Sequence, residues 1–165
     1  MASDRLKPNF FQRLAAQLAG SRPGSWLFAR LGHHVDRAFA RLTGGRTFGA
    51  MLVGLPVVML TTKGRRSGEP RTTPVVALPD GDRLILVASN WGQQHHPGWY
   101  YNLRAEPACV ITFRGEARRY RARHVTGEER ARYWARATAA YPGFGAYARR
   151  TDREIAIFIL EREYE

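Results

Sequence analysis

Cysteine is nearly absent from this sequence: in 165 residues the single one is Cys109, in an apolar run where we expect it to pack. An intrachain disulfide is therefore excluded, and nothing points to an oxidising compartment. Long apolar runs are also missing, since the longest, residues 51–60, is too short to cross a bilayer. Residues 1–24 lack the apolar core of a signal peptide. We therefore expect a cytoplasmic protein.

Acidic residues are scarce relative to basic ones. The chain has 14 Asp and Glu against 26 Lys and Arg, which gives a net charge of +12 with His neutral. Such an excess indicates an anionic partner or substrate, and nucleic acid, an acidic membrane face and a phosphorylated ligand all fit. Charge alone does not choose among them, so the positions of the cations must decide.

The length fits one domain of ordinary size with an N-terminal helical extension. We place the extension at residues 1–44 and the domain at residues 45–165. Within the extension, residues 25–42 have apolar residues at helical spacing and arginines on the other side. Two interpretations stay open: peripheral contact with the anionic inner face of the cell membrane, or a helix packed on the domain with its cationic face in solvent.

Short stretches rich in Val, Ile, Thr, Leu and aromatic residues follow, separated by Gly-containing turns. They are residues 57–62, 72–78, 84–89, 108–113, 118–125 and 155–161. We predict a mainly β (α+β) fold, a small barrel of about six antiparallel strands with a few peripheral helices. The helices are expected at residues 98–105 and 127–140, the second starting with a capping box between Thr126 and Glu129. The row Arg119, Arg121 and Arg123 should face outward.

The stretch "TTKGRRSGEPR", starting at Thr61, combines glycines, hydroxyl side chains and four cations. Gly64 and Gly68 permit a tight backbone, while Ser67 and the neighbouring cations suit an anion such as phosphate. The stretch is not a nucleoside-triphosphate P-loop, because the Gly-Lys-Ser/Thr ending is absent. A solvated cationic hairpin loop is the alternative that the residues themselves leave open.

Two further stretches concentrate aromatic rings. "ASNWGQQHHPGWYYNLRAEP" follows a predicted strand that ends near Ser89, and "AAYPGFGAYARRTDRE" surrounds two glycines with rings. Flat rings at this density suit stacking on a planar ligand, although each ring alone is as compatible with a core position. Adjacent histidines point apart in extended chain and lack a third ligand, so we predict no metal site.

In this order, the motifs "LTTKGRRSGEPRTTP", "VASNWGQQHHPGWYYNLRAEP", "VTGEER", "AYPGFGAY" and "RTDREI" resemble those of the deazaflavin-dependent nitroreductase-like oxidoreductases of actinobacteria. The resemblance runs from about Gly45 to the C-terminus. It implies a split β-barrel like that of FMN-binding proteins, with coenzyme F420 as cofactor. It also implies hydride transfer from the reduced coenzyme to a quinone-like or other electron-poor acceptor. A homodimer is a further implication.

The resemblance also implies roles for individual residues. The cofactor-binding set is Thr62, Gly64, Arg65, Arg66, Ser67, Arg71, Pro74, Val87, Ala88, Asn90 and Trp99. The catalytic set is Ser89, Tyr141 and Tyr147, which could donate a hydrogen bond or proton to the acceptor, and the substrate-binding set is Trp91 and Phe144. Relatives that activate nitroimidazoles have lysine and glycine at the positions of Asn90 and Trp91, and tyrosine in place of Phe144. The resemblance therefore supports cofactor binding more strongly than nitroimidazole reduction.

Two other functions stay open. The same barrel type binds FMN, whose phosphate would also suit the basic loop. A nucleic-acid-binding barrel could use the arginine row and the loop on phosphates and stack rings on bases, although we expect no nucleic acid.

Overall fold

A computed structural model describes residues 55–164 of the chain. The predicted extension of residues 1–44, including the amphipathic segment 25–42, lies outside the described residues. The strands are β1 (Val57–Lys63), β2 (Pro70–Asp80), β3 (Arg83–Val87), β4 (Ala108–Phe113), β5 (Glu116–Val125) and β6 (Ile157–Arg162). The helices are the 3-10 turn η1 (Asn90–Gly92), α4 (Gly98–Ala105), α5 (Gly127–Ala140) and α6 (Gly143–Ala148).

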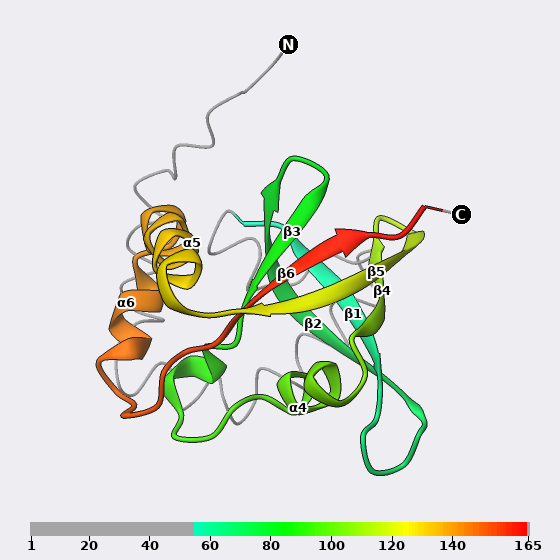
Figure 1. Cartoon of the computed structure of the whole chain (residues 1–165), viewed down its shortest axis with the longest axis horizontal. Helices are drawn as coiled ribbons and strands as arrows, with labels where there is room; N and C mark the ends of the chain where they lie inside the picture. Colours follow the sequence, from blue (N-terminus) through cyan, green and yellow to red (C-terminus); the bar gives the residue numbers. More distant parts are fainter. Residues whose placement is uncertain (1–54, 165) are drawn as a thin grey trace.

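The strands of the described residues form a closed antiparallel barrel in the order β1-β2-β3-β6-β5-β4, with β4 pairing back onto β1 (Figure 1). This confirms the predicted barrel. The β4–β5 hairpin has a two-residue loop in which Arg114 and Gly115 both have positive φ. Such loops match the right-handed twist of the flanking strands, which explains why the Gly-containing turns in the sequence signalled antiparallel neighbours.

Two apolar clusters hold the barrel together. Inward side chains such as Leu60, Leu86 and Phe158 fill the interior, together with Trp99 and Leu103 of α4, which closes one end. Outward side chains of β3 and β6, with Val125 at the end of β5, pack against α5 and α6. Figure 1 shows α5 and α6 together on one side of the barrel. Alternate residues of β3 therefore serve two different cores.

The start of α5 departs from the predicted capping box. Thr126 occupies the N-cap position, but no side-chain cap hydrogen bond forms there. The Glu129 carboxylate instead accepts two hydrogen bonds from the Arg123 guanidinium, at 2.7 and 2.8 Å. A bidentate charge-assisted pair is stronger than a neutral cap, so the Glu129 carboxylate pairs with the arginine on β5 and does not cap the helix. Arg119, Arg121 and Arg123 face outward, as predicted.

The stretch around Tyr141, Phe144 and Tyr147, which the sequence marked only as rings and glycines, contains the short helix α6. Gly143 opens this helix in close contact with Tyr141, because a Cβ there would overlap the Tyr141 ring. Among the described residues, no helix has the length and apolar character that crossing a bilayer requires.

Candidate functional site

The loop between β1 and β2 is closed by its own backbone. The Gly64 amide donates to the Glu69 carbonyl at 2.8 Å, and the Gly68 amide donates to the Gly64 carbonyl at 2.7 Å. Gly64 has no room for a side chain, since a Cβ would lie 2.8 Å from Ser67 Oγ. Gly68 has a φ of 73°, where glycine is favoured. The loop is therefore as tight as the sequence predicted.

The cations of this loop have no acidic partner among the residues that the structure describes. Within residues 55–164, no carboxylate forms an ion pair with Lys63, Arg65, Arg66 or Arg71. Several arginines elsewhere do have one, including Arg136 with Asp80 at 2.5 Å. In the same part of the chain, the amides of Arg66 and Ser67 donate to no protein acceptor. Unneutralised charge beside two consecutive free amides can bind an anion.

Helix α4 holds the loop in place through Asn102. The Asn102 Oδ1 atom accepts a hydrogen bond from the Arg65 amide at 3.1 Å, and its Nδ2 atom donates to Thr62 Oγ1 at 3.0 Å. The Arg65 guanidinium also lies over the Tyr101 ring, 4.7 Å from its centroid. Thr62 is only 2% exposed, so its hydroxyl belongs to this support rather than to solvent. No pattern in the sequence pointed to Asn102 or to its contacts with Arg65 and Thr62.

The other predicted group lies where β3 ends and η1 begins. Asn90 and Trp91 have φ values of 46° and 58°, a left-handed conformation that costs a residue with a side chain about 1 kcal/mol or more. The Asn90 amide group offsets part of this cost by donating to the His95 carbonyl at 2.9 Å. Ser89 is half-buried, and within the described residues its hydroxyl makes no hydrogen bond. Backbone strain of this kind concentrates at functional sites.

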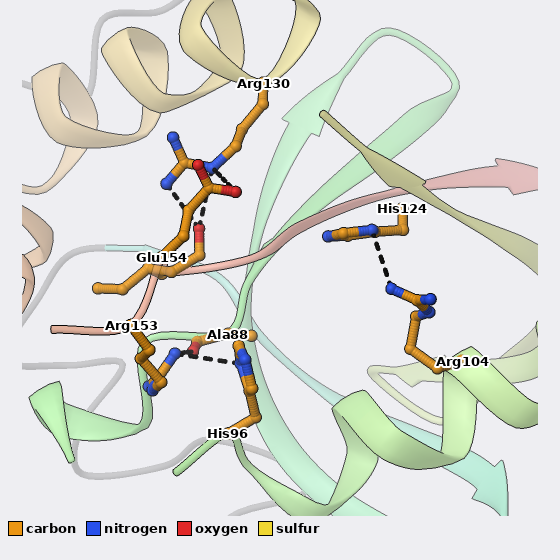
Figure 2. Close-up of polar contacts among 8 residues, drawn as sticks. Ala88, His96, Arg104, His124, Arg130, Arg153 and Glu154 are labelled. Carbon is orange, nitrogen blue, oxygen red and sulfur yellow. Dashed lines mark hydrogen bonds and ion pairs between the residues drawn. The ribbon is translucent and has the colours of Figure 1, made fainter. Parts of the chain in front are cut away.

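Arg153 lies beside this strand end and contacts Ala88 and His96 (Figure 2). Its guanidinium donates to the carbonyls of Ala88 at 3.1 Å, Ser89 at 2.7 Å and Gln93 at 2.9 Å. A fourth contact joins Arg153 Nη1 to His96 Nδ1 at 3.1 Å. Because the arginine must donate, His96 accepts at Nδ1, and burial lowers the pKa of His96 below 6.5. Arg153 lies within the motif "RTDREI", but no pattern in the sequence indicated a role for it.

The aromatic residues predicted for catalysis and substrate binding, Tyr141 at the C-cap of α5 and Phe144 and Tyr147 of α6, form a buried cluster. Tyr141, Phe144 and Tyr147 are 5%, 4% and 2% exposed, and the two tyrosine hydroxyls lie 3.1 Å apart. Burial raises the pKa of both tyrosines, so they remain protonated hydrogen-bond donors near neutral pH. Trp91 joins the cluster through an edge contact with Tyr147, at 5.9 Å between centroids. The structure thus brings η1 and α6 together.

The remaining predicted residues lie on different faces. Pro74 and Val87 are half-buried, and Val87 packs against the outer cluster. Ala88 and Trp99 lie in the barrel interior, where the Trp99 ring meets Phe158 edge-on at 5.9 Å. Cys109 is also interior, and burial raises its thiol pKa to about 12, which fits a packing role.

One helix connects the two groups of site residues. The chain runs from η1 into the start of α4, and Asn102 in the last turn of α4 contacts the basic loop. An eight-residue helix is about 12 Å long. The loop and the Ser89 strand end therefore lie at the same end of the barrel.

Comparison with known proteins gives a consistent result. Residues 33–162 match the family model described as F420H(2)-dependent quinone reductase. Rv3178 of Mycobacterium tuberculosis is 35% identical over 106 residues, which cover 64% of this chain and 89% of that protein. The solved structure of an F420-H2 dependent reductase, FDR-A, is 36% identical, covering 64% of this chain and 94% of that chain with a TM-score of 0.59. A structure described as a domain-swapped dimer is 29% identical, covering 84% and 99% with a TM-score of 0.61.

Proposed function

The chain belongs to the F420H(2)-dependent quinone reductase family, and on that basis we propose that it transfers hydride from reduced coenzyme F420 to a quinone-like or other electron-poor organic acceptor. The observation that carries the proposal is the β1–β2 loop of a chain from this family: within the described residues its cations have no carboxylate partner, and the amides of Arg66 and Ser67 have no acceptor. Quinone reduction is the activity in the family's description; reduction of nitro compounds has no comparable support.

The loop fits the coenzyme because the tail of F420 carries a phosphate and further acidic groups. Arg65, Arg66, Ser67 and Arg71 would hold this tail by charge-assisted hydrogen bonds. Thr62 and Gly64 would act indirectly, since the hydroxyl of one is bonded to Asn102 and the other is packed against Ser67. When bound, the reduced deazaflavin supplies a hydride in a single two-electron step.

The ring end of the site would lie beside Pro74, Val87 and Asn90, at the end of β3. Ala88 and Trp99 face the barrel interior, so they would support this surface from behind rather than touch the ring. Arg153 holds the Ala88 and Ser89 carbonyls, which would keep the strand end rigid while a planar group is bound. Preorganised positioning of this kind lowers the entropic cost of the reaction.

On the acceptor side, the free Ser89 hydroxyl would donate a hydrogen bond to a quinone oxygen as negative charge develops on it. Tyr141 and Tyr147 are protonated donors that now bond to each other, so either would serve once α6 shifts. Trp91 and Phe144 would then form the apolar wall of the acceptor pocket. A homodimer is also part of this proposal, and the related structure described as a domain-swapped dimer supports it. Membrane contact through residues 25–42 is proposed from the amphipathic pattern of the sequence alone.

The activity is tested with purified full-length protein, reduced F420 and menadione. We expect reduced F420 to be oxidised only when both the enzyme and the quinone are present. The return of the absorbance and fluorescence of oxidised F420 measures this reaction. Ser89→Ala should lower kcat roughly a hundredfold, with little change in the Kd of the coenzyme. Lack of turnover while a known relative is active under the same conditions would contradict the proposal, as would tight FMN binding without F420 affinity.

Coenzyme binding is tested separately, by fluorescence titration with oxidised F420. Arg66→Ala and Arg71→Ala should each weaken binding by about 10-fold or more, because each removes a charge-assisted hydrogen bond. Arg121→Ala is the matched control, since Arg121 lies on β5 and pairs with Glu163 at 3.0 Å. Equal losses in all three variants would indicate a general charge effect and would count against a phosphate site in the loop.

A further inference from the structure

The barrel has a concave region at the end opposite α4. A cavity of about 200 Å³ opens there, with apolar walls that include Val58, Ala77, Leu84, Ile111 and Phe113. These residues come from four different strands, so the cavity is the mouth of the barrel interior rather than a surface groove. None of them belongs to the site described above.

The cavity is well separated from the basic loop. Strand β1 begins beside the cavity at Val57 and ends at Lys63, where the loop starts. Six steps along a strand span about 20 Å. Figure 1 shows the β1–β2 hairpin and α4 at one end of the barrel and the β2–β3 hairpin at the other. A ligand in the cavity would therefore not touch the coenzyme site.

The size and lining of the cavity define the ligand class. An apolar cavity of about 150 Å³ is large enough for benzene, so one of about 200 Å³ accommodates a substituted single ring. Phe113 is 41% exposed at the rim, which gives the entrance an apolar surface. Small-molecule sites combine such walls with a few polar groups that orient the ligand.

Tyr120 supplies the polar group. It is 7% exposed and lines the cavity from β5, yet within residues 55–164 its hydroxyl has no hydrogen-bond partner. This hydroxyl is therefore free to exchange hydrogen bonds with a ligand that carries a hydroxyl or carbonyl. Glu116 and Arg118, on the same face of β5, pair with each other at 2.6 Å at the mouth. Since their charges cancel, the mouth favours an uncharged ligand over an ionic one.

We propose that the open end of the barrel is a binding site for an uncharged single-ring molecule, held by the apolar walls and by one hydrogen bond to the Tyr120 hydroxyl. The site is independent of the coenzyme and of the proposed hydride transfer. Nothing in the proposal requires the two sites to be occupied together.

The test uses the full chain and two probes of the same shape, p-cresol and toluene, which differ in one hydroxyl group. Binding is measured by NMR titration. We expect p-cresol to bind saturably with a Kd of about 1 mM or lower, the affinity that burial of one ring supplies. Tyr120→Phe should weaken p-cresol binding about five-fold, because it removes the hydrogen bond, and should leave toluene binding unchanged.

Two variants that fill the cavity complete the design. Ala77→Leu adds carbons deep in the cavity and Leu84→Trp fills the mouth, so each should abolish binding of both probes. Thermal melting identifies a variant that fails to fold. If one of the two variants does not fold, the result of the other is used. Arg66→Ala, in the separate basic loop, should bind p-cresol like the unmodified chain. The proposal is overturned by an absence of saturable binding, by binding that the filled cavity retains, or by equal effects of Tyr120→Phe on the two probes.

Discussion

At the scale of single residues, Arg153 is the most constrained cation of the site. It is half-buried, and its hydrogen bonds go to backbone carbonyls and an imidazole instead of a carboxylate. Burial lowers its pKa from the ordinary arginine value, yet an arginine remains charged at any physiological pH. The guanidinium therefore places a positive charge directly behind the Ser89 backbone. In the proposed site it would act by positioning Ser89 rather than by touching the reacting groups.

Arg153→Lys should destabilise the protein by about 2–4 kcal/mol, because an ammonium cannot satisfy three carbonyls and His96 in the geometry of a guanidinium. Urea unfolding measures this loss. In the folded fraction, kcat should fall while the Kd of F420 stays the same, since the basic loop is not affected. Arg136→Lys is the control: its exposed pair with Asp80 should contribute less than about 1 kcal/mol. Equal stability of the two variants would show that Arg153 is not a structural anchor.

At the scale of secondary structure, α4 connects the two groups of candidate site residues, the basic loop and the strand end at Ser89. Its Trp99 and Leu103 side chains are anchored in the barrel interior, while Asn102 holds the basic loop. A short helix of this kind would be unstable alone, so tertiary packing must fix its position. The rigidity of the loop therefore depends on the packing of α4 in the barrel core.

Asn102→Ala should weaken F420 binding by roughly 5- to 10-fold without removing any charge, because the Arg65 amide and the Thr62 hydroxyl lose their partner. The stability of the whole domain should fall by only about 1–2 kcal/mol. Asn102→Asp keeps the acceptor for the Arg65 amide but adds a negative charge beside the loop, so it serves as the comparison for stability and not for F420 affinity. Fluorescence titration and urea unfolding measure the two effects. Unchanged affinity in Asn102→Ala would show that the loop does not depend on α4.

The strands and two of the helices could be predicted from the sequence because each has a local signal. The β4–β5 hairpin, for example, is specified by a Gly-containing turn between apolar runs. Helix α6 could not be predicted, since its two glycines and the preceding proline are typical of a loop; it forms because its rings pack with Tyr141. The capping box failed because Arg123, on another element, binds Glu129.

At the scale of the whole molecule, some parts of the candidate site could be predicted from local sequence signals and others could not. The basic loop was visible in the sequence because its glycines and cations are consecutive. Its support from Asn102 was not, since that residue lies 37 positions from Arg65. Arg153 is 64 positions from Ser89, so only the closed barrel shows that they are bonded. Contacts across such separations leave no periodic pattern in a single sequence.

The fold also predicts how stability depends on pH. Burial lowers the pKa of both His96 and His124 below the ordinary value of 6.5. Each ring faces an arginine at Nδ1, Arg153 for His96 and Arg104 for His124 (Figure 2). Tyr100 packs on both rings, and His124 also has a buried Nε2 atom without a hydrogen-bond partner in the described residues. The folded state therefore favours both imidazoles in their neutral form.

The free energy of unfolding should consequently be independent of these groups above about pH 6.5 and should fall as the pH decreases from there towards 5. In that range the unfolded chain takes up protons at both positions and the folded chain resists them. Asp80 and Glu129, whose ordinary carboxyl pKa values of 3.8 and 4.5 are lowered, respond only at more acidic pH. Urea unfolding at several pH values measures the slope, and replacing both His96 and His124 with glutamine should flatten it. A stability that stayed constant or rose between pH 6.5 and 5 would contradict the assignment of both histidines as neutral.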